Sequence, residues 1–107
     1  MTDSPTTSFD LLSTQLLQDP DLDVSVTATG LHVRGQLFAY LDGDELAVDL
    51  PHDRAGDLVG REVASRVPAA RAEAKGAWVR VAATEDWPEL AAEAHQFVGE
   101  PAVGRDS

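Results

Sequence analysis

Apolar residues recur every three or four positions in three segments of this chain, which is the spacing of an amphipathic helix. The three segments span residues 8–18, 52–63 and 87–98. Ser8 suits the N-cap of the first segment. Pro51 can open the second, because the N–H that proline lacks would have no intrahelical partner there. We therefore predict three helices.

Between these segments, apolar and polar residues alternate with the period of two that marks a strand. The alternation covers residues 23–28, 31–34, 45–50 and 77–83. The apolar run 37–41 is a further strand, and the loop 64–76 has room for one short strand. Asp42-Gly43 is a preferred hairpin dipeptide, because both residues tolerate positive φ. The pattern predicts an antiparallel sheet of about four to five strands.

The segment 37–41 is apolar or aromatic on both of its faces, which favours a central strand of the sheet. Alternation places Phe38 and Tyr40 on one face and the three aliphatic residues of the segment on the other. In the strand that follows, the same rule places Asp49 on the outward face.

These elements predict a single α+β domain over residues 8–98, with three helices packed on the antiparallel sheet. A chain of 107 residues is long enough to bury one core but not two. Residues 1–7 and 99–107 are polar, small or helix-breaking, so we expect both segments to be disordered tails.

The chain is strongly acidic, with 19 Asp and Glu against eight Lys and Arg and a net charge of −11. Such a charge repels phosphate backbones and anionic lipids, and it fits either ordinary acidic solubility or adaptation to salt. Most basic residues nevertheless fall in one segment, which makes a locally basic patch a candidate nucleic-acid contact. Its members are Arg54, Arg61, Arg66, Arg71, Lys75 and Arg80.

No motif for catalysis, a cofactor or a metal ion is visible in the sequence. The chain has no cysteine, which excludes disulfides, thiolate zinc sites and cysteine nucleophiles. Its three histidines share no helix at a four-residue spacing, and no nucleophile elbow or phosphate loop is present. We expect a protein without enzymatic activity or cofactor. With no apolar run long enough for a membrane span and no signal peptide, we expect it to be cytoplasmic.

Four stretches carry a resemblance to a known family: Gly35-Gln36-Leu37-Phe38-Ala39, the strand Glu45–Leu50 with Pro51 after it, the helix Asp53–Val63, and Lys75-Gly76-Ala77-Trp78-Val79. In these stretches the chain resembles the MmcQ/YjbR-like family, which is related to the TfoX N-terminal domain. The resemblance implies an α+β double-wing fold, a DNA-binding label that comes from likeness of fold, and a link to competence regulation.

The chain departs from that family at two places. Thr29-Gly30-Leu31-His32-Val33 replaces a Met-Phe-Gly-Gly-like run, and Asp49 stands where a basic residue is common. Both departures, and the net charge, count against nucleic-acid binding.

Three functions follow as hypotheses. The first is a non-enzymatic binding or regulatory module that acts through protein contacts, with a homodimer as one form. The second is nucleic-acid binding through the segment from Arg54 to Arg80, and the third is small-molecule binding. Phe38, Tyr40 and Trp78 could form an aromatic surface for bases or a ligand, against the alternative that they pack beneath the helices.

Overall fold

The computed structural model describes residues 5–20, 23–67 and 74–99 of the chain. The described residues form three α-helices, a short 3-10 helix and six strands. In chain order these are α1 (Pro5–Leu17), β1 (Val24–Val26), β2 (Leu31–Val33), β3 (Gln36–Asp42), β4 (Glu45–Leu50), α2 (His52–Gly60), β5 (Ala64–Arg66), β6 (Ala77–Val81), η2 (Thr84–Asp86) and α3 (Trp87–Gly99).

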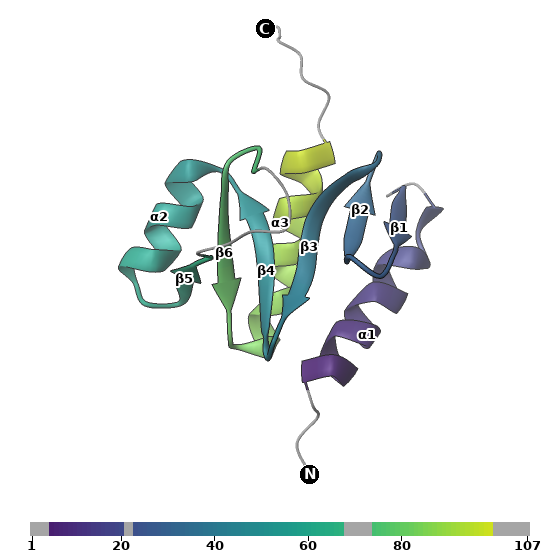
Figure 1. The fold of residues 1–107 in the computed structure, drawn as a ribbon, viewed down its shortest axis with the longest axis horizontal. Coiled ribbons are helices and arrows are strands. Elements are labelled where there is room, and N and C mark those ends of the chain that lie inside the picture. The colour runs from purple at the N-terminus through teal and green to yellow at the C-terminus, as the bar shows by residue number, and fades with distance from the viewer. Residues whose placement is uncertain (1–4, 21–22, 68–73, 100–107) are drawn as a thin grey trace, which may run out of the picture.

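The six strands form one antiparallel sheet in the order β1-β2-β3-β4-β6-β5 (Figure 1). The α+β class is therefore confirmed, with six strands in place of about four to five. The edge strand β5 occupies the segment where the sequence left room for one short strand. The hairpin predicted at Asp42-Gly43 joins β3 to β4, and Gly43 has the positive φ of 63° that this turn requires.

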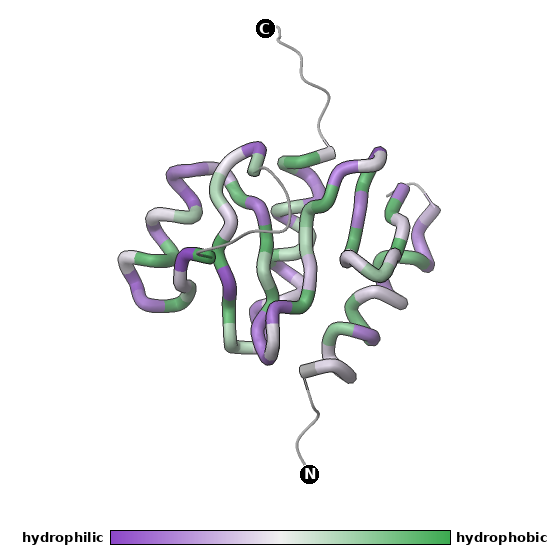
Figure 2. Tube along the Cα trace, in the orientation of Figure 1, coloured by the Kyte–Doolittle hydropathy of each residue, from purple (hydrophilic) through white to green (hydrophobic). Residues whose placement is uncertain are grey.

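All three helices contribute side chains to one core on the same face of the sheet. α3 lies across β3 and β4, α2 lies beside β5 and β6, and α1 lies beside β1 (Figure 1). Leu12 of α1, Leu58 of α2 and Leu90 of α3 are each less than 5% exposed within this core. Hydrophobic residues run along the central strands and the inner sides of the helices (Figure 2).

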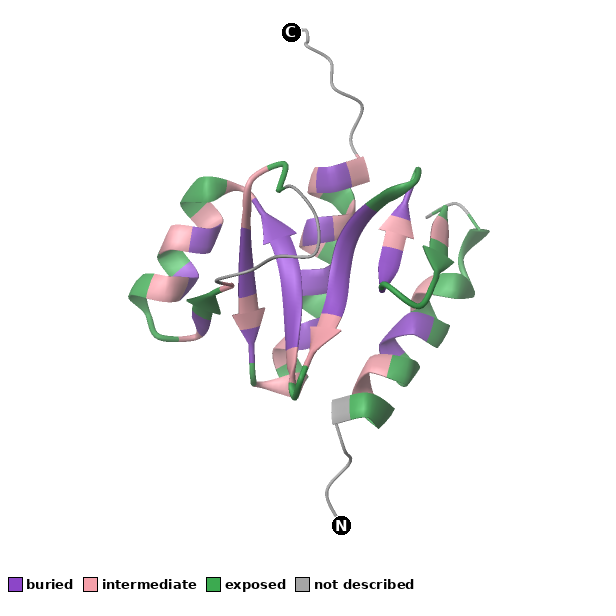
Figure 3. Ribbon diagram, viewed as in Figure 1, coloured by how far each residue is buried: buried purple, intermediate pink, exposed green. Residues whose placement is uncertain are grey.

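A second, smaller apolar cluster lies on the opposite face of the sheet. It consists of Leu37, Tyr40, Ala47 and Trp78, all buried. The two central strands are consequently buried on both faces, which Figure 3 shows as nearly continuous burial along β3 and β4. The prediction of a central strand that is covered on both sides is confirmed.

A bulge in β3 changes which residues share a face. Leu31 pairs with Ala39, whereas the next residue, His32, pairs with Leu37, so Phe38 is an extra residue on β3. The bulge turns Phe38 to the helix side together with Ala39, while Tyr40 lies in the opposite cluster. The prediction that Phe38 and Tyr40 share a face is therefore wrong, because alternation does not hold across a bulge.

Two helix boundaries also differ from the prediction. α1 begins at Pro5 rather than at a Ser8 cap, since proline suits a first helical turn. α2 ends at Gly60 instead of residue 63, because Glu62 adopts a left-handed φ of 63°. The amide of Glu62 then donates to the Val59 carbonyl, which is half of a Schellman motif.

The other half of this motif joins the next residue to the helix. The Val63 amide donates to the Leu58 carbonyl at 3.0 Å, and both side chains face α3. Of the predicted terminal tails, residues 5–7 and Gly99 are helical, and residues 1–4 and 100–107 lie outside the described residues.

Candidate functional site

The basic residues that the sequence groups together lie on different parts of the described structure. Arg54 and Arg61 lie on and directly after α2, on the helix side of the sheet. Arg66 is exposed on the edge strand β5, and Arg80 pairs with Ala47 of the opposite cluster. Lys75 lies just before β6, and Arg71 falls outside the described residues. The described basic residues therefore do not converge on one surface.

Arg54 is held in an ion pair that joins α2 to α3. Its Nε and Nη2 donate to the two carboxylate oxygens of Glu93 at 2.9 and 3.1 Å. Its Nη1 lies 3.5 Å from Asp57 Oδ2. The hydrogen bonds to Glu93 raise the pKa of Arg54, as do the charges of Glu93, Asp57 and Glu89, while partial burial lowers it. All of its guanidinium nitrogens have acidic partners.

Three more of these basic residues also have partners. Arg61 Nη2 lies 3.2 Å from Asp57 Oδ2, and Arg80 Nη1 lies 3.6 Å from Asp42 Oδ2. Lys75 Nζ donates to the Phe97 carbonyl at 2.7 Å, in the last turn of α3, where the helix dipole favours a cation. Its ammonium also lies 5.2 Å from the centroid of the Phe97 ring. These contacts oppose a phosphate-binding role for the predicted patch.

The three aromatic residues predicted as one surface are divided between the two faces of the sheet. Tyr40 and Trp78 pack against each other, with ring centroids 5.2 Å apart, and they are 2% and 6% exposed. Phe38 makes an edge-to-face contact with His95 of α3, at 5.4 Å between centroids. A stacking platform needs exposed ring faces, and these rings are buried instead.

A groove separates α1 from η2 and the start of α3. We call it the α1–η2 groove; it has a volume of about 200 Å³. Its lining residues are Ser8, Leu11, Leu12, Gln15, Thr84, Glu85, Trp87 and Pro88. Leu11 is 55% exposed, whereas its neighbour Leu12 is buried in the core. Trp87 is fixed beneath the groove, because its Nε1 donates to the Val81 carbonyl at 2.9 Å.

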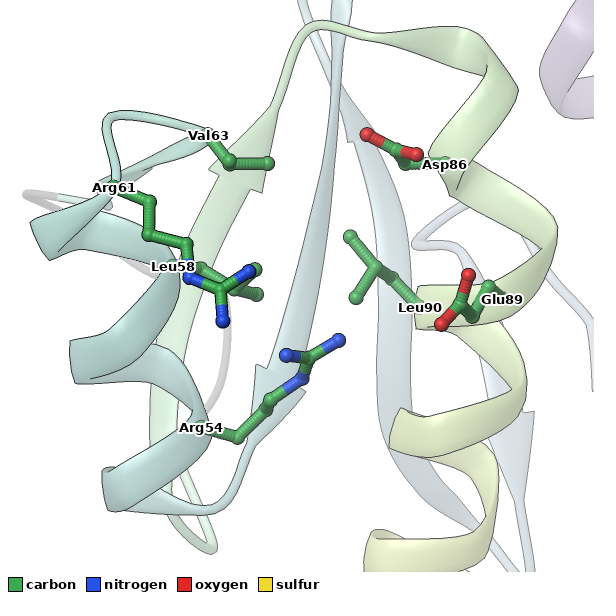
Figure 4. Close-up of a pocket in the computed structure, with 7 residues that line it drawn as sticks. All are labelled: Arg54, Leu58, Arg61, Val63, Asp86, Glu89 and Leu90. Atoms are coloured by element: carbon green, nitrogen blue, oxygen red, sulfur yellow. The ribbon is translucent and has the colours of Figure 1, made fainter.

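A second depression, which we call the α2–α3 cleft, has a volume of about 150 Å³ (Figure 4). Arg54 and Arg61 extend into it from the α2 side, and Asp86 and Glu89 line the α3 side. Its remaining lining residues are Leu58, Val63 and Leu90. The sequence analysis missed both depressions, because each forms only where helices distant in sequence pack side by side.

Asp49 is a further residue whose position the sequence analysis misjudged. It was predicted to face outward, but it is only 1% exposed. Its carboxylate accepts hydrogen bonds from the backbone amides of Lys75 and Gly76, at 2.7 and 2.9 Å. The outward side of β4 is the second buried face of the sheet, so the prediction is wrong. The carboxylate fixes the segment that leads into β6.

No group of three or more His, Asp or Glu side chains in the described parts of the chain is arranged to hold a metal ion. None of the described helices combines the length and the hydropathy needed to cross a bilayer. In comparisons with family models, curated proteins and solved structures, no match to this chain was found. The resemblance to the MmcQ/YjbR-like family therefore stays a prediction.

Proposed function

We propose that this domain is a non-enzymatic binding module that acts through protein contacts, and that the α1–η2 groove is its contact surface. The observation that carries the proposal is Leu11, a large apolar side chain that is 55% exposed at the edge of this groove. Pro88 and the buried Trp87 line the other side of the groove. Apolar side chains around a hollow with polar edges are typical of a site that receives an apolar side chain of a partner.

The charge of the domain selects the class of partner. Glu85 lines the groove, and Asp86 and Glu89 follow in the adjoining turn of η2 and α3. With a net charge of −11, the domain repels acidic partners, a second copy of itself included. We therefore commit to a basic, amphipathic segment of another protein as the occupant of the groove.

A model peptide tests this proposal. The probe is an amphipathic helix of about 15 residues built from Leu, Lys and Ala, with leucine every three or four positions. Two control peptides accompany it: a scrambled peptide of the same composition, and one with Glu in place of every Lys. Isothermal titration calorimetry should give binding for the first peptide alone, because it combines an apolar stripe with positive charge.

Two matched variants locate the binding. Leu11→Ser removes the exposed side chain of the groove, and Leu17→Ser removes one that is 50% exposed on the same helix but does not line the groove. Leu11→Ser removes about half of the transfer free energy of a buried leucine, roughly 1 kcal/mol, from the binding free energy. The variant should therefore weaken binding about fivefold. Leu17→Ser should leave the affinity unchanged.

Three results would overturn the proposal: equal binding of the scrambled peptide, equal effects of Leu11→Ser and Leu17→Ser, or the absence of binding. Light scattering tests the alternative that a second copy of the chain occupies the groove, because it measures whether the protein is a dimer. A dimer that Leu11→Ser dissociates would assign the groove to self-association rather than to a basic partner.

Nucleic-acid binding is the alternative that the sequence left open. The ion pairs of Arg54, Arg61 and Arg80 with carboxylates argue against it, because a phosphate would have to displace those acids. Fluorescence anisotropy with duplex and single-stranded DNA at low salt tests it where phosphate attraction is strongest. Absence of binding under those conditions removes the alternative.

A further inference from the structure

The α2–α3 cleft has walls of opposite charge, and none of its lining residues lines the α1–η2 groove. The wall on the α2 side carries the guanidinium groups of Arg54 and Arg61, and the wall on the α3 side carries the carboxylates of Asp86 and Glu89 (Figure 4). No ion pair or hydrogen bond across the cleft between these lining residues is found within the described part of the chain.

Arg54 connects the two walls of the cleft. All three of its guanidinium nitrogens are engaged by Glu93 and Asp57, and its bidentate contact with Glu93 connects α2 to α3. Arg54 is therefore unsuited to bind a ligand. Its contribution is to hold the two walls at a fixed separation.

Arg61 is the donor that the cleft offers to an anionic group. Its side chain is 65% exposed, and its ion pair with Asp57 uses Nη2, which lies 3.2 Å from Asp57 Oδ2. A guanidinium has five N–H donors in a planar fork that matches a carboxylate. The Arg61 side chain extends toward the cleft (Figure 4).

The opposite wall offers acceptors to a cation. Asp86 is half-buried at the end of η2 and Glu89 is exposed in the first turn of α3. Between the walls, Leu58 and Leu90 are 4% and 2% exposed, and Val63 is half-buried, so the floor is apolar. A ligand that fits all three parts needs an anionic group, a cationic group and a short apolar body.

We propose that the α2–α3 cleft binds an apolar α-amino acid in its zwitterionic form. The carboxylate of the ligand lies on Arg61, its ammonium lies between Asp86 and Glu89, and its side chain covers Leu58 and Leu90. The cleft has a volume of about 150 Å³, which is room for a small molecule.

Three probes that differ by one charged group test the proposal on the full chain. They are L-leucine, 3-methylbutylamine, which lacks the carboxylate, and 4-methylpentanoate, which lacks the ammonium. Amide chemical shifts are followed by NMR up to about 50 mM ligand, since affinities of an open cleft for so small a ligand are on the order of millimolar. Leucine should bind up to about fivefold more tightly than either analogue, because each analogue loses one charged contact at a solvent-exposed site.

Variants of each wall test which wall binds the carboxylate of the ligand and which binds its ammonium. Arg61→Gln should weaken leucine binding by up to about fivefold and abolish the preference for leucine over 3-methylbutylamine. The double variant Asp86→Asn, Glu89→Gln should abolish the preference for leucine over 4-methylpentanoate. Arg66→Gln is the matched control, because Arg66 is exposed on β5 and does not line the cleft. The dispersion of the amide spectrum verifies that each variant is folded.

Several results would overturn the inference. Equal binding of 3-methylbutylamine and leucine would make the cleft a simple cation site. Equal effects of Arg61→Gln and Arg66→Gln would remove the cleft as the site, as would shift changes confined to residues away from its lining. Unchanged spectra with leucine would remove the ligand. None of these results bears on the α1–η2 groove, which Leu11→Ser tests separately.

Discussion

Replacing Asp49 by asparagine is the sharpest test of how the sheet is held together. The Asp49 carboxylate is 1% exposed, and each of its two oxygens accepts one backbone N–H, from Lys75 and from Gly76. Asparagine keeps the shape of the side chain but replaces one oxygen by an NH₂ group. One of the two amides then loses its acceptor and faces a donor.

The size of the effect follows from these contacts. A hydrogen bond to a charged acceptor contributes about 1.5–3 kcal/mol, and an amide left buried without a partner costs about 1–3 kcal/mol. Burying the neutral asparagine side chain costs less desolvation free energy than burying a carboxylate, and this difference offsets part of the lost hydrogen-bond energy. We therefore expect Asp49→Asn to lower the free energy of unfolding by about 2 kcal/mol, and Asp49→Ala by about 3–4 kcal/mol because both amides then lack an acceptor.

Urea denaturation followed by tryptophan fluorescence measures this free energy, since Trp78 and Trp87 are both buried. Asp44→Asn is the matched control, because Asp44 is exposed in the turn between β3 and β4 and should change the free energy of unfolding by less than about 0.5 kcal/mol. If Asp49→Asn and Asp44→Asn cost the same, the carboxylate does not fix the entry to β6 and the reasoning is wrong.

Three further predictions concern stability and use the same assay. Gly76→Ala should lower the free energy of unfolding by about 3 kcal/mol, because the added Cβ would collide with the β4 backbone. Gly56→Ala should raise it by about 0.5–1 kcal/mol, because the added Cβ would meet no described atom within 4 Å. The reverse order of the two variants would refute the packing at Gly76. Glu62→Gly should stabilise by about 0.5–1 kcal/mol by relieving the left-handed φ of 63°, and a loss of stability would contradict that account. A double-mutant cycle of Arg54→Gln and Glu93→Gln should give a coupling of about 1 kcal/mol that falls in high salt, and a coupling independent of salt would show that charge is not its source.

The sequence was sufficient for the elements whose periodicity is unbroken. The apolar spacing of α3 and the alternation of β4 depend on local pattern alone, so both were predicted nearly to the residue. Phe38 was misplaced because one inserted residue shifts the register, and no local signal marks a bulge in an all-apolar strand. Glu62 was misplaced because a Schellman end without glycine has no sequence signature.

Less of the candidate sites than of the fold could be predicted from the sequence. A cluster of basic residues in sequence indicates a basic surface only if those residues face the same side without acidic partners, and Arg54 and Arg80 lie on opposite sides of the sheet. Asp49 was assigned to solvent because alternation identifies a face but not what covers it. Leu11 lies in the predicted helical segment 8–18, whose apolar spacing does not show which of its leucines reach the core. In the structure Leu12 is buried, whereas Leu11 lines the groove and is 55% exposed.

The central claim is that the α1–η2 groove receives an apolar side chain from a basic partner. Amide chemical-shift mapping with the Leu/Lys/Ala peptide tests it most directly. We predict that the perturbed amides lie on α1, on η2 and at the start of α3, and that Leu11→Ser needs about fivefold more peptide to shift them to the same extent. Perturbations confined to the edge strands or to α2, or the same peptide concentration dependence in Leu11→Ser, would contradict the claim.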